Sequence, residues 1–178
     1  MINTTLCYLE RGEEYLMLHR TKKENDLNHD KWIGVGGKFQ DKESPEDCLL
    51  RETWEELGIP ESAVTVIGEM DFIHIRAGSL LRPVLGEVDP ATLAAMRPAP
   101  EEVADTFLLP LRELKAHPPE VYLYRQPVEA PDFPYADAGV PADYPWRPWR
   151  LEVPVYHGLP YHLWGIAARI TMDLLAHL

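Results

Sequence analysis

The 178-residue chain is poor in cysteine and has no long hydrophobic run. Its two cysteines, Cys7 and Cys48, are too few for a disulfide framework, which favours a reducing, cytoplasmic location. No apolar run approaches the roughly 20 residues that span a bilayer, so we expect no membrane partner. Residues 1–5 lack the basic and apolar pattern of a secretory signal, which also favours the cytoplasm.

Basic residues are also scarce, since 17 Lys and Arg stand against 29 Asp and Glu, for a formal net charge of −12. A nucleic-acid-binding surface needs a basic patch, so we expect no nucleic-acid partner. A small phosphate-containing molecule remains compatible with this charge, because a divalent cation reverses the local sign of a site. The length fits a single domain over residues 1–178, and the sequence contains no internal repeat.

Short apolar segments separated by turns predict a mixture of strands and helices. The predicted strands are 3–9, 14–19, 64–67, 70–75, 80–88, 103–109 and 150–156. The remaining predicted segments are a polar loop at 20–31, a short helix or loop at 90–101, a short helix at 111–117 and a closing helix at about 161–177. The segment 127–148 contains six prolines and is typical of an irregular loop or lid. Strands and helices without regular alternation predict an α/β or α+β fold with a mixed sheet.

The clearest predicted helix covers residues 45–57. Ser44 is a good N-cap, Pro45 suits the first helical position, and Asp47 completes a pattern similar to a capping box. Gly58 follows as a C-terminal stop. Local signals therefore define both ends of this helix.

Three glutamates on this helix form an acidic face. Glu52, Glu55 and Glu56 stand at i, i+3 and i+4 and share an arc of about 100°. Their spacing alone fits an exposed acidic face whose repulsion Arg51 relieves. It equally fits a magnesium or manganese site, because these ions prefer hard oxygen ligands on a rigid element.

The residues before the helix favour the metal site. Three glycines within residues 34–37 permit unusual backbone angles and a close approach to a ligand. Glu43 adds another acid just before the N-cap. Arg51 could pair with Glu55 on the helix, or it could reach Glu43 and fix the loop to the helix.

The same residues form a recognisable pattern, Gly37-x5-Glu43-x7-Arg51-Glu52-Thr53-x-Glu55-Glu56-x-Gly58-Ile59. It resembles the Nudix box of the Nudix hydrolases over residues 37–59, with Thr53 where the pattern usually has an aliphatic residue. The resemblance implies an α/β/α sandwich with a mixed sheet. It also implies that a nucleoside diphosphate linked to another group is hydrolysed with Mg²⁺, Mn²⁺ being the alternative cation.

The resemblance further assigns roles to individual residues. The implied metal ligands are Glu52, Glu55, Glu56 and the carbonyl of Gly37, with Glu43 and Arg51 in structural support. The general base is either Glu52 or a glutamate of a later loop, where Glu101 and Glu102 match and Glu102 is slightly favoured. A solvated turn is the alternative interpretation of that pair.

The two flanks of the box resemble different branches of the family. Residues 1–40 resemble MutT-like hydrolases of oxidised nucleoside triphosphates, although Ile33 cannot form the hydrogen bond that would read an oxidised base. Residues after the box resemble coenzyme A pyrophosphatases, without the Phe-Pro-Gly-Gly entry of that branch. The chain therefore has the character of a natural recombinant or a chimera, with the change at about residues 40–50. The expected substrate contacts are Lys38, Trp32, Ile33 and Arg20.

These observations favour coenzyme A or a related nucleotide as substrate, with a nucleoside triphosphate as the alternative. A non-catalytic Nudix-fold module that binds a nucleotide is the alternative from another class. A homodimer is compatible with the sequence, although no residue pattern demonstrates one.

Overall fold

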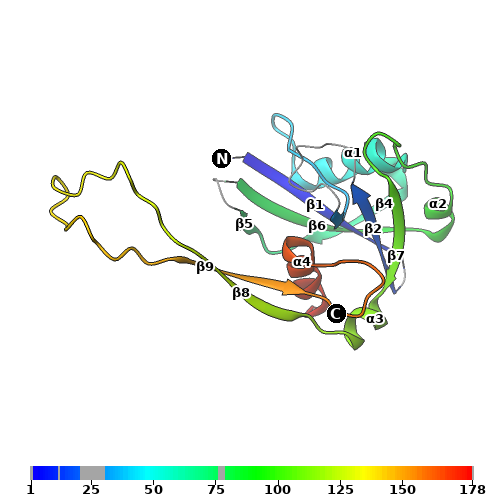
Figure 1. Ribbon diagram of the computed structural model, residues 1–178. Coiled ribbons are helices and arrows are strands. Elements are labelled where there is room, and N and C mark those ends of the chain that lie inside the picture. The colour runs from blue at the N-terminus through cyan, green and yellow to red at the C-terminus, as the bar shows by residue number, and fades with distance from the viewer. Residues whose placement is uncertain (1, 12, 21–30, 76–78, 178) are drawn as a thin grey trace.

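A computed structural model describes residues 2–11, 13–20, 31–75 and 79–177, which form an α/β fold around a mixed seven-stranded sheet (Figure 1). The strands of this sheet are β1 (Ile2–Arg11), β2 (Glu14–Arg20), β3 (Lys31–Ile33), β4 (Val64–Glu69), β5 (Ile73–Ile75), β6 (Ser79–Val88) and β7 (Asp105–Pro110). Two further strands, β8 (Glu120–Gln126) and β9 (Trp149–Val155), form a separate two-stranded sheet.

The order of the large sheet is β3-β2-β1-β6-β4, with β5 also paired to β6 and β7 also paired to β2. β1 and β2 form an antiparallel hairpin, as the sequence predicted. β1 and β6 run parallel, whereas β4 and β6 are antiparallel. The mixed sheet is therefore confirmed.

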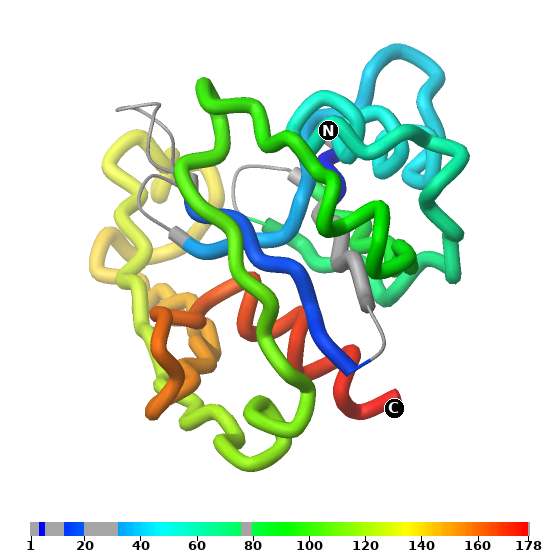
Figure 2. Tube along the Cα trace, turned by 90° about the vertical axis from the view of Figure 1, so that its right-hand side faces the viewer, coloured from blue at the N-terminus to red at the C-terminus, as the bar shows by residue number. Residues whose placement is uncertain are grey.

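Both faces of this sheet are buried, because alternate residues of β2 enter two different cores. Tyr15 and Met17 pack with residues of α4, whereas Leu16 and Leu18 pack with residues of α1. The helices are α1 (Pro45–Leu57), α2 (Pro90–Ala94), α3 (Leu111–Ala116) and α4 (Gly165–Leu175). α1 and α4 thus lie on opposite sides of the sheet, which is the expected sandwich (Figures 1 and 2). Within the described ranges, no helix has both the length and the apolar character needed to cross a membrane.

α1 has the boundaries that its local signals predict. The Ser44 hydroxyl accepts a hydrogen bond from the Asp47 amide at 3.0 Å. Gly58 ends the helix in the left-handed region at φ 64°, where a side chain would be strained. The helix is therefore rigidly defined over the residues that carry the acidic face.

The closing helix begins later than expected. α4 starts at Gly165 and not near residue 161. The Tyr156 amide donates a hydrogen bond to the Leu163 carbonyl at 2.9 Å, and Val155 forms a bridge with Trp164. This pairing with β9 holds Trp164 in an extended conformation immediately before Gly165 and overrides the local helix signal.

The sequence analysis also missed β8, which pairs with β9 along its whole length. The two strands form an arm that leaves the body beside α4, and the proline-rich segment 127–148 lies at its far end (Figure 1). This segment is irregular, as expected. It lies away from α1, however, so it does not cover that helix as a lid would in this structure. The predicted loop at 20–31 lies mostly outside the described residues.

Candidate functional site

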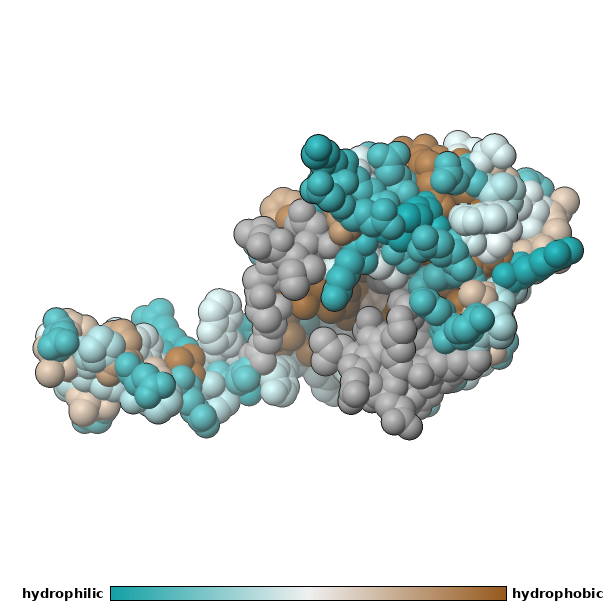
Figure 3. All heavy atoms as spheres, turned by 90° about the horizontal axis from the view of Figure 1, so that it is seen from above, coloured by the Kyte–Doolittle hydropathy of each residue, from teal (hydrophilic) through white to brown (hydrophobic). Residues whose placement is uncertain are grey.

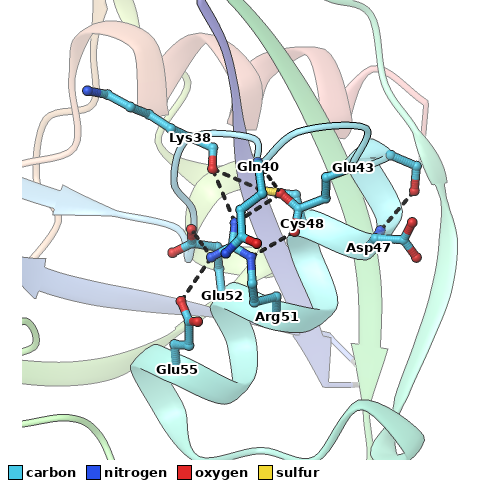
Figure 4. Close-up of polar contacts among 9 residues, drawn as sticks. Lys38, Gln40, Glu43, Asp47, Cys48, Arg51, Glu52 and Glu55 are labelled. Atoms are coloured by element: carbon cyan, nitrogen blue, oxygen red, sulfur yellow. Dashed lines mark hydrogen bonds and ion pairs between the residues drawn. The ribbon is translucent and has the colours of Figure 1, made fainter.

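Arg51 is the centre of a polar cluster that joins α1 to the preceding loop (Figure 4). Its Nε donates to Glu43 Oε1 at 2.7 Å and its Nη2 donates to Glu43 Oε2 at 3.0 Å. The Nη2 group also donates to the Lys38 carbonyl at 3.1 Å. Two parallel bonds to one carboxylate fix both position and orientation, so this pair fixes the loop to the helix.

The same guanidinium brings two of the three glutamates among the predicted metal ligands together. Arg51 Nη1 donates to Glu52 Oε1 at 2.7 Å and to Glu55 Oε2 at 2.9 Å. The alternatives that the sequence left open, pairing with Glu55 or with Glu43, therefore both occur. One cationic nitrogen is the point at which two carboxylates converge.

Glu56 lies apart from this convergence. Its side chain is only 2% exposed, and the Gly36 amide donates to its Oε2 at 3.4 Å. Among the described residues, no group of three acidic, histidine or cysteine side chains is already arranged as a metal site. The oxygen donors nevertheless suit a hard divalent cation, and two of them already face a positive charge.

Gly37 leaves room for the Glu52 carboxylate in its observed position. A Cβ atom at this position would overlap the Glu52 carboxylate, at 2.7 Å from Oε2 and closer still to Oε1 and Cδ. The Gly37 carbonyl, expected as a further ligand, accepts a hydrogen bond from the Thr5 amide at 2.9 Å. A carbonyl oxygen has a second lone pair, so this bond does not prevent it from binding a cation.

Burial and neighbouring charges shift the pKa values of the cluster. Burial raises the pKa of Glu52, and hydrogen bonding to Arg51 opposes that rise only in part. The negative charges of Glu55 and Glu102 raise the pKa of Glu52 further. In contrast, hydrogen bonding to Arg51 lowers the pKa of Glu43 to about 2. Burial thus destabilises the ionised form of Glu52, whereas Arg51 stabilises the ionised form of Glu43.

The loop with Glu101 and Glu102 is tied to the C-terminal end of α1. The Arg97 amide donates to the Leu57 carbonyl and the Ala99 amide donates to the Glu56 carbonyl, both at 2.8 Å. Glu102 is partly buried and its charge acts on Glu52, whereas Glu101 is exposed. The geometry therefore distinguishes two neighbours between which the sequence only slightly favoured Glu102.

The expected substrate contacts lie in different environments. The Lys38 side chain is exposed and points away from the carboxylates (Figure 4). Trp32 is partly buried and stacks on His19 with ring centroids 4.5 Å apart. Ile33 is only 6% exposed and packs in the core, so it offers little surface to a substrate. The side chain of Arg20 lies outside the described residues.

Two features of the structure were not identified from the sequence. Phe107 and Tyr161 stack with centroids 3.7 Å apart, and both rings also contact Trp32. Cys48 receives a hydrogen bond from Arg51 Nη2 at 3.4 Å, while burial raises the pKa of its thiol to about 12. The aromatic cluster joins segments far apart in the chain, so no local pattern reveals it.

Comparison with known proteins identifies a family and several relatives. The NUDIX domain family matches residues 2–129. The chain is 29% identical over 145 residues to mitochondrial coenzyme A diphosphatase NUDT8 of Mus musculus, covering 79% of this chain and 60% of the mouse protein. It is 30% identical over 130 residues to the Homo sapiens protein of that name, covering 71% of this chain and 48% of the human protein. The chain thus spans only about half to three-fifths of the length of these relatives.

Solved structures show the same fold. An Ap4A hydrolase binary complex from C. elegans has a TM-score of 0.50 at 18% identity, with 65% of this chain and 85% of that chain covered. A NUDIX hydrolase from Nitrosomonas europaea has a TM-score of 0.51 at 15% identity, with 62% and 58% covered. The family match covers more than half of the chain, and the chain therefore belongs to the Nudix hydrolase family of pyrophosphohydrolases.

Proposed function

We propose that this protein uses a divalent cation, Mg²⁺ or alternatively Mn²⁺, to hydrolyse a phosphoanhydride bond in a nucleoside diphosphate compound. One observation carries the proposal, namely that the carboxylates of Glu52 and Glu55 converge on Arg51 Nη1 at 2.7 and 2.9 Å. Closely spaced carboxylate oxygens are the hard donors that Mg²⁺ prefers. Family membership supports this, since Nudix enzymes bind small nucleotides and typically use a divalent metal.

The ligands in this proposal are Glu52, Glu55 and Glu56, with the Gly37 carbonyl as a further donor. A bound divalent cation neutralises the diphosphate and makes the attacking water more acidic. Arg51 and Glu43 keep the loop and α1 in a fixed relation, so that ligands from both segments stay aligned. Such alignment is what a positioned reaction needs.

The chain's own base removes a proton from the attacking water. As the water oxygen forms a bond to phosphorus, the bond from phosphorus to the bridging oxygen breaks, and the carboxylate takes the proton. Glu52 and Glu102 are the two bases in question, and we favour Glu102. Its charge already acts on Glu52, and its loop is tied to α1.

Glu102→Gln and Glu101→Gln form a matched pair of variants that tests this assignment. We expect E102Q to lower kcat on the order of 100-fold, because proton transfer contributes at least that much. E101Q should keep the wild-type rate, since its side chain is exposed. Full activity in E102Q would exclude Glu102 as the base and leave Glu52 as the remaining candidate.

For the substrate we favour coenzyme A or a related nucleotide. The support is the similarity to the two NUDT8 proteins, whose names state coenzyme A diphosphatase activity. A nucleoside triphosphate is the alternative, because residues 1–40 resemble MutT-like enzymes. The decisive measurement is kcat/KM for coenzyme A against an oxidised deoxyguanosine triphosphate, with Mg²⁺ and with chelator. A higher value for the triphosphate would reverse the preference.

Glu55→Gln and Glu56→Gln test whether the protein is an enzyme or a binding module. Each variant should lower the rate by orders of magnitude while circular dichroism and the melting temperature show an intact fold. Glu46→Gln, on the same helix but outside the acidic face, is the control that should keep full activity. Nucleotide binding without turnover in the wild type would favour the non-catalytic module.

The cytoplasmic location of this protein stays a prediction. The names of the two relatives state a mitochondrial location for those proteins.

A further inference from the structure

The arm formed by β8 and β9 has two chemically different faces. Directly paired residues of antiparallel strands share a face, and the register pairs Tyr122 with Val153, Tyr124 with Leu151 and Gln126 with Trp149. The same face carries Glu120 at the base of the arm, opposite Val155, and from Tyr122 to Trp149 it carries no charged residue. We call the five residues Tyr122, Tyr124, Trp149, Leu151 and Val153 the apolar strip.

The other face of the arm is charged. It pairs Leu123 with Glu152 and places Arg125 directly opposite Arg150, with the apolar pair Val121 and Pro154 at the base of the arm. Charged side chains keep this face in water, whereas none does so on the apolar strip. This difference indicates that the apolar strip, and not the charged face, contacts another surface.

The apolar strip is exposed in the single chain. Trp149 is 73% exposed, Tyr124 52%, Leu151 48% and Tyr122 45%. The arm stands clear of the body (Figures 1 and 3). An isolated two-stranded ribbon is marginally stable at best in water, so this arm needs a surface to pack on.

The far end of the arm is organised by its own contacts. Phe133, Tyr144 and Trp146 form edge-to-face ring contacts at centroid distances of 5.0 to 5.1 Å. Trp146 Nε1 donates to the Tyr135 hydroxyl at 3.1 Å. The base is held as well, through the bridge between Val155 and Trp164. An arm fixed at both ends presents the strip as a preformed surface.

We propose that the apolar strip is a dimerisation surface that packs on the same strip of a second copy about a two-fold axis. Such an interface is self-complementary, because the same patch serves both subunits. A chain with a net charge of −12 repels itself over most of its surface, and the uncharged strip is where two copies can approach. Tyrosine and tryptophan are also the residues enriched at protein interfaces.

The available area suits a reversible dimer. With ring side chains of about 150–250 Å² each, the exposed parts of the strip amount to roughly 900 Å² over two copies. That is just below the roughly 1,000 Å² that a stable specific interface exceeds, which is the range of a weak, reversible association. An acidic membrane or a nucleic acid fits less well, because the strip offers no basic side chain.

Sedimentation velocity of the full chain over a concentration series tests the proposal. We expect the wild type to move from the 20.4 kDa monomer to twice that mass as the concentration rises. Tyr124→Ser and Trp149→Ser should each raise the dimer dissociation constant at least tenfold while circular dichroism shows the same fold. Leu123→Ser is the matched control, since it removes a similarly exposed apolar side chain from the charged face.

A wild type that stays monomeric throughout would overturn the proposal. So would a dimer that L123S weakens as much as W149S does.

Cysteine cross-linking gives a second measurement, which does not require a variant that weakens the dimer. Leu151→Cys, near the middle of the strip, should form a covalent dimer under mild oxidation. Glu152→Cys on the charged face should behave as the wild type, which carries Cys7 and Cys48 as background.

Discussion

At the scale of single residues, Gly37 determines where the Glu52 carboxylate can lie. A Cβ atom there would overlap Glu52, whose flexible side chain would have to move away from Arg51. We therefore expect Gly37→Ala to lower the hydrolytic rate on the order of 100-fold, because a small misplacement of a reacting group has that effect. The melting temperature should change little, since only the end of one side chain moves.

Gly68→Ala is the control for this change, because a Cβ atom at Gly68 would meet nothing within 4 Å. Rate and melting temperature are measured for both variants with the same substrate. Wild-type activity in G37A would show that the close approach of Gly37 to Glu52 has no part in catalysis.

Thr53, the residue that departs from the usual Nudix pattern, sits fully buried in α1 at 0% exposure. Within the described part of the chain, its hydroxyl has no hydrogen-bond partner. Thr53→Val keeps the shape and removes this buried polar atom, so we expect about 1 kcal/mol of added stability. In urea unfolding, Thr171→Val should instead lose stability, because that hydroxyl donates to the Ala167 carbonyl at 2.9 Å. Destabilisation by T53V would mean that the hydroxyl is satisfied in solution.

At the scale of elements, the ion pair between Glu43 and Arg51 makes the junction of loop and helix sensitive to pH. The pKa of Glu43 falls from 4.5 to about 2 in the folded protein because Arg51 donates to its carboxylate. The ionised pair stabilises the fold fully above pH 4.5, and this contribution is lost as the pH falls toward 2. We expect Glu43→Gln to lose about 2 kcal/mol near neutral pH and to approach the wild type near pH 2–3.

The measurement is the free energy of unfolding in urea at several pH values. Glu61→Gln removes an exposed carboxylate and should follow the wild type at every pH. If the difference in unfolding free energy between E43Q and wild type does not shrink in acid, the ion pair is not its cause.

The elements also show which parts of the fold a sequence can predict. α1 was predicted to the residue, because Ser44, Pro45 and Gly58 act through contacts within a few positions. The start of α4 was not, because the pairing of Val155 with Trp164 comes from a strand outside the helix. In the site, the glutamates follow from spacing on one helix. The link from Glu102 to α1 does not, since it depends on a hydrogen bond between Ala99 and Glu56.

At the scale of the whole molecule, the arm separates segment 127–148 from α1 (Figure 1). The sequence suggested a lid, because proline-rich segments of this length often cover active sites. No local pattern could reveal its position, which depends on the missed pairing of β8 with β9. Whether this segment takes part in catalysis is therefore a question for the whole chain.

Replacing residues 127–148 by Asn-Gly tests whether this segment takes part in catalysis. Gln126 lies directly opposite Trp149, and a two-residue Asn-Gly turn joins antiparallel strands in that register. We expect kcat/KM within about twofold of the wild type and a melting temperature within about 2–4 °C, a shift that corresponds to roughly 1 kcal/mol in a protein of this size. The physical reason is that the removed segment lies far from the acidic face and outside both cores. A large fall in kcat/KM with an unchanged melting temperature would show that the tip closes over the site during turnover, and would restore the interpretation as a lid.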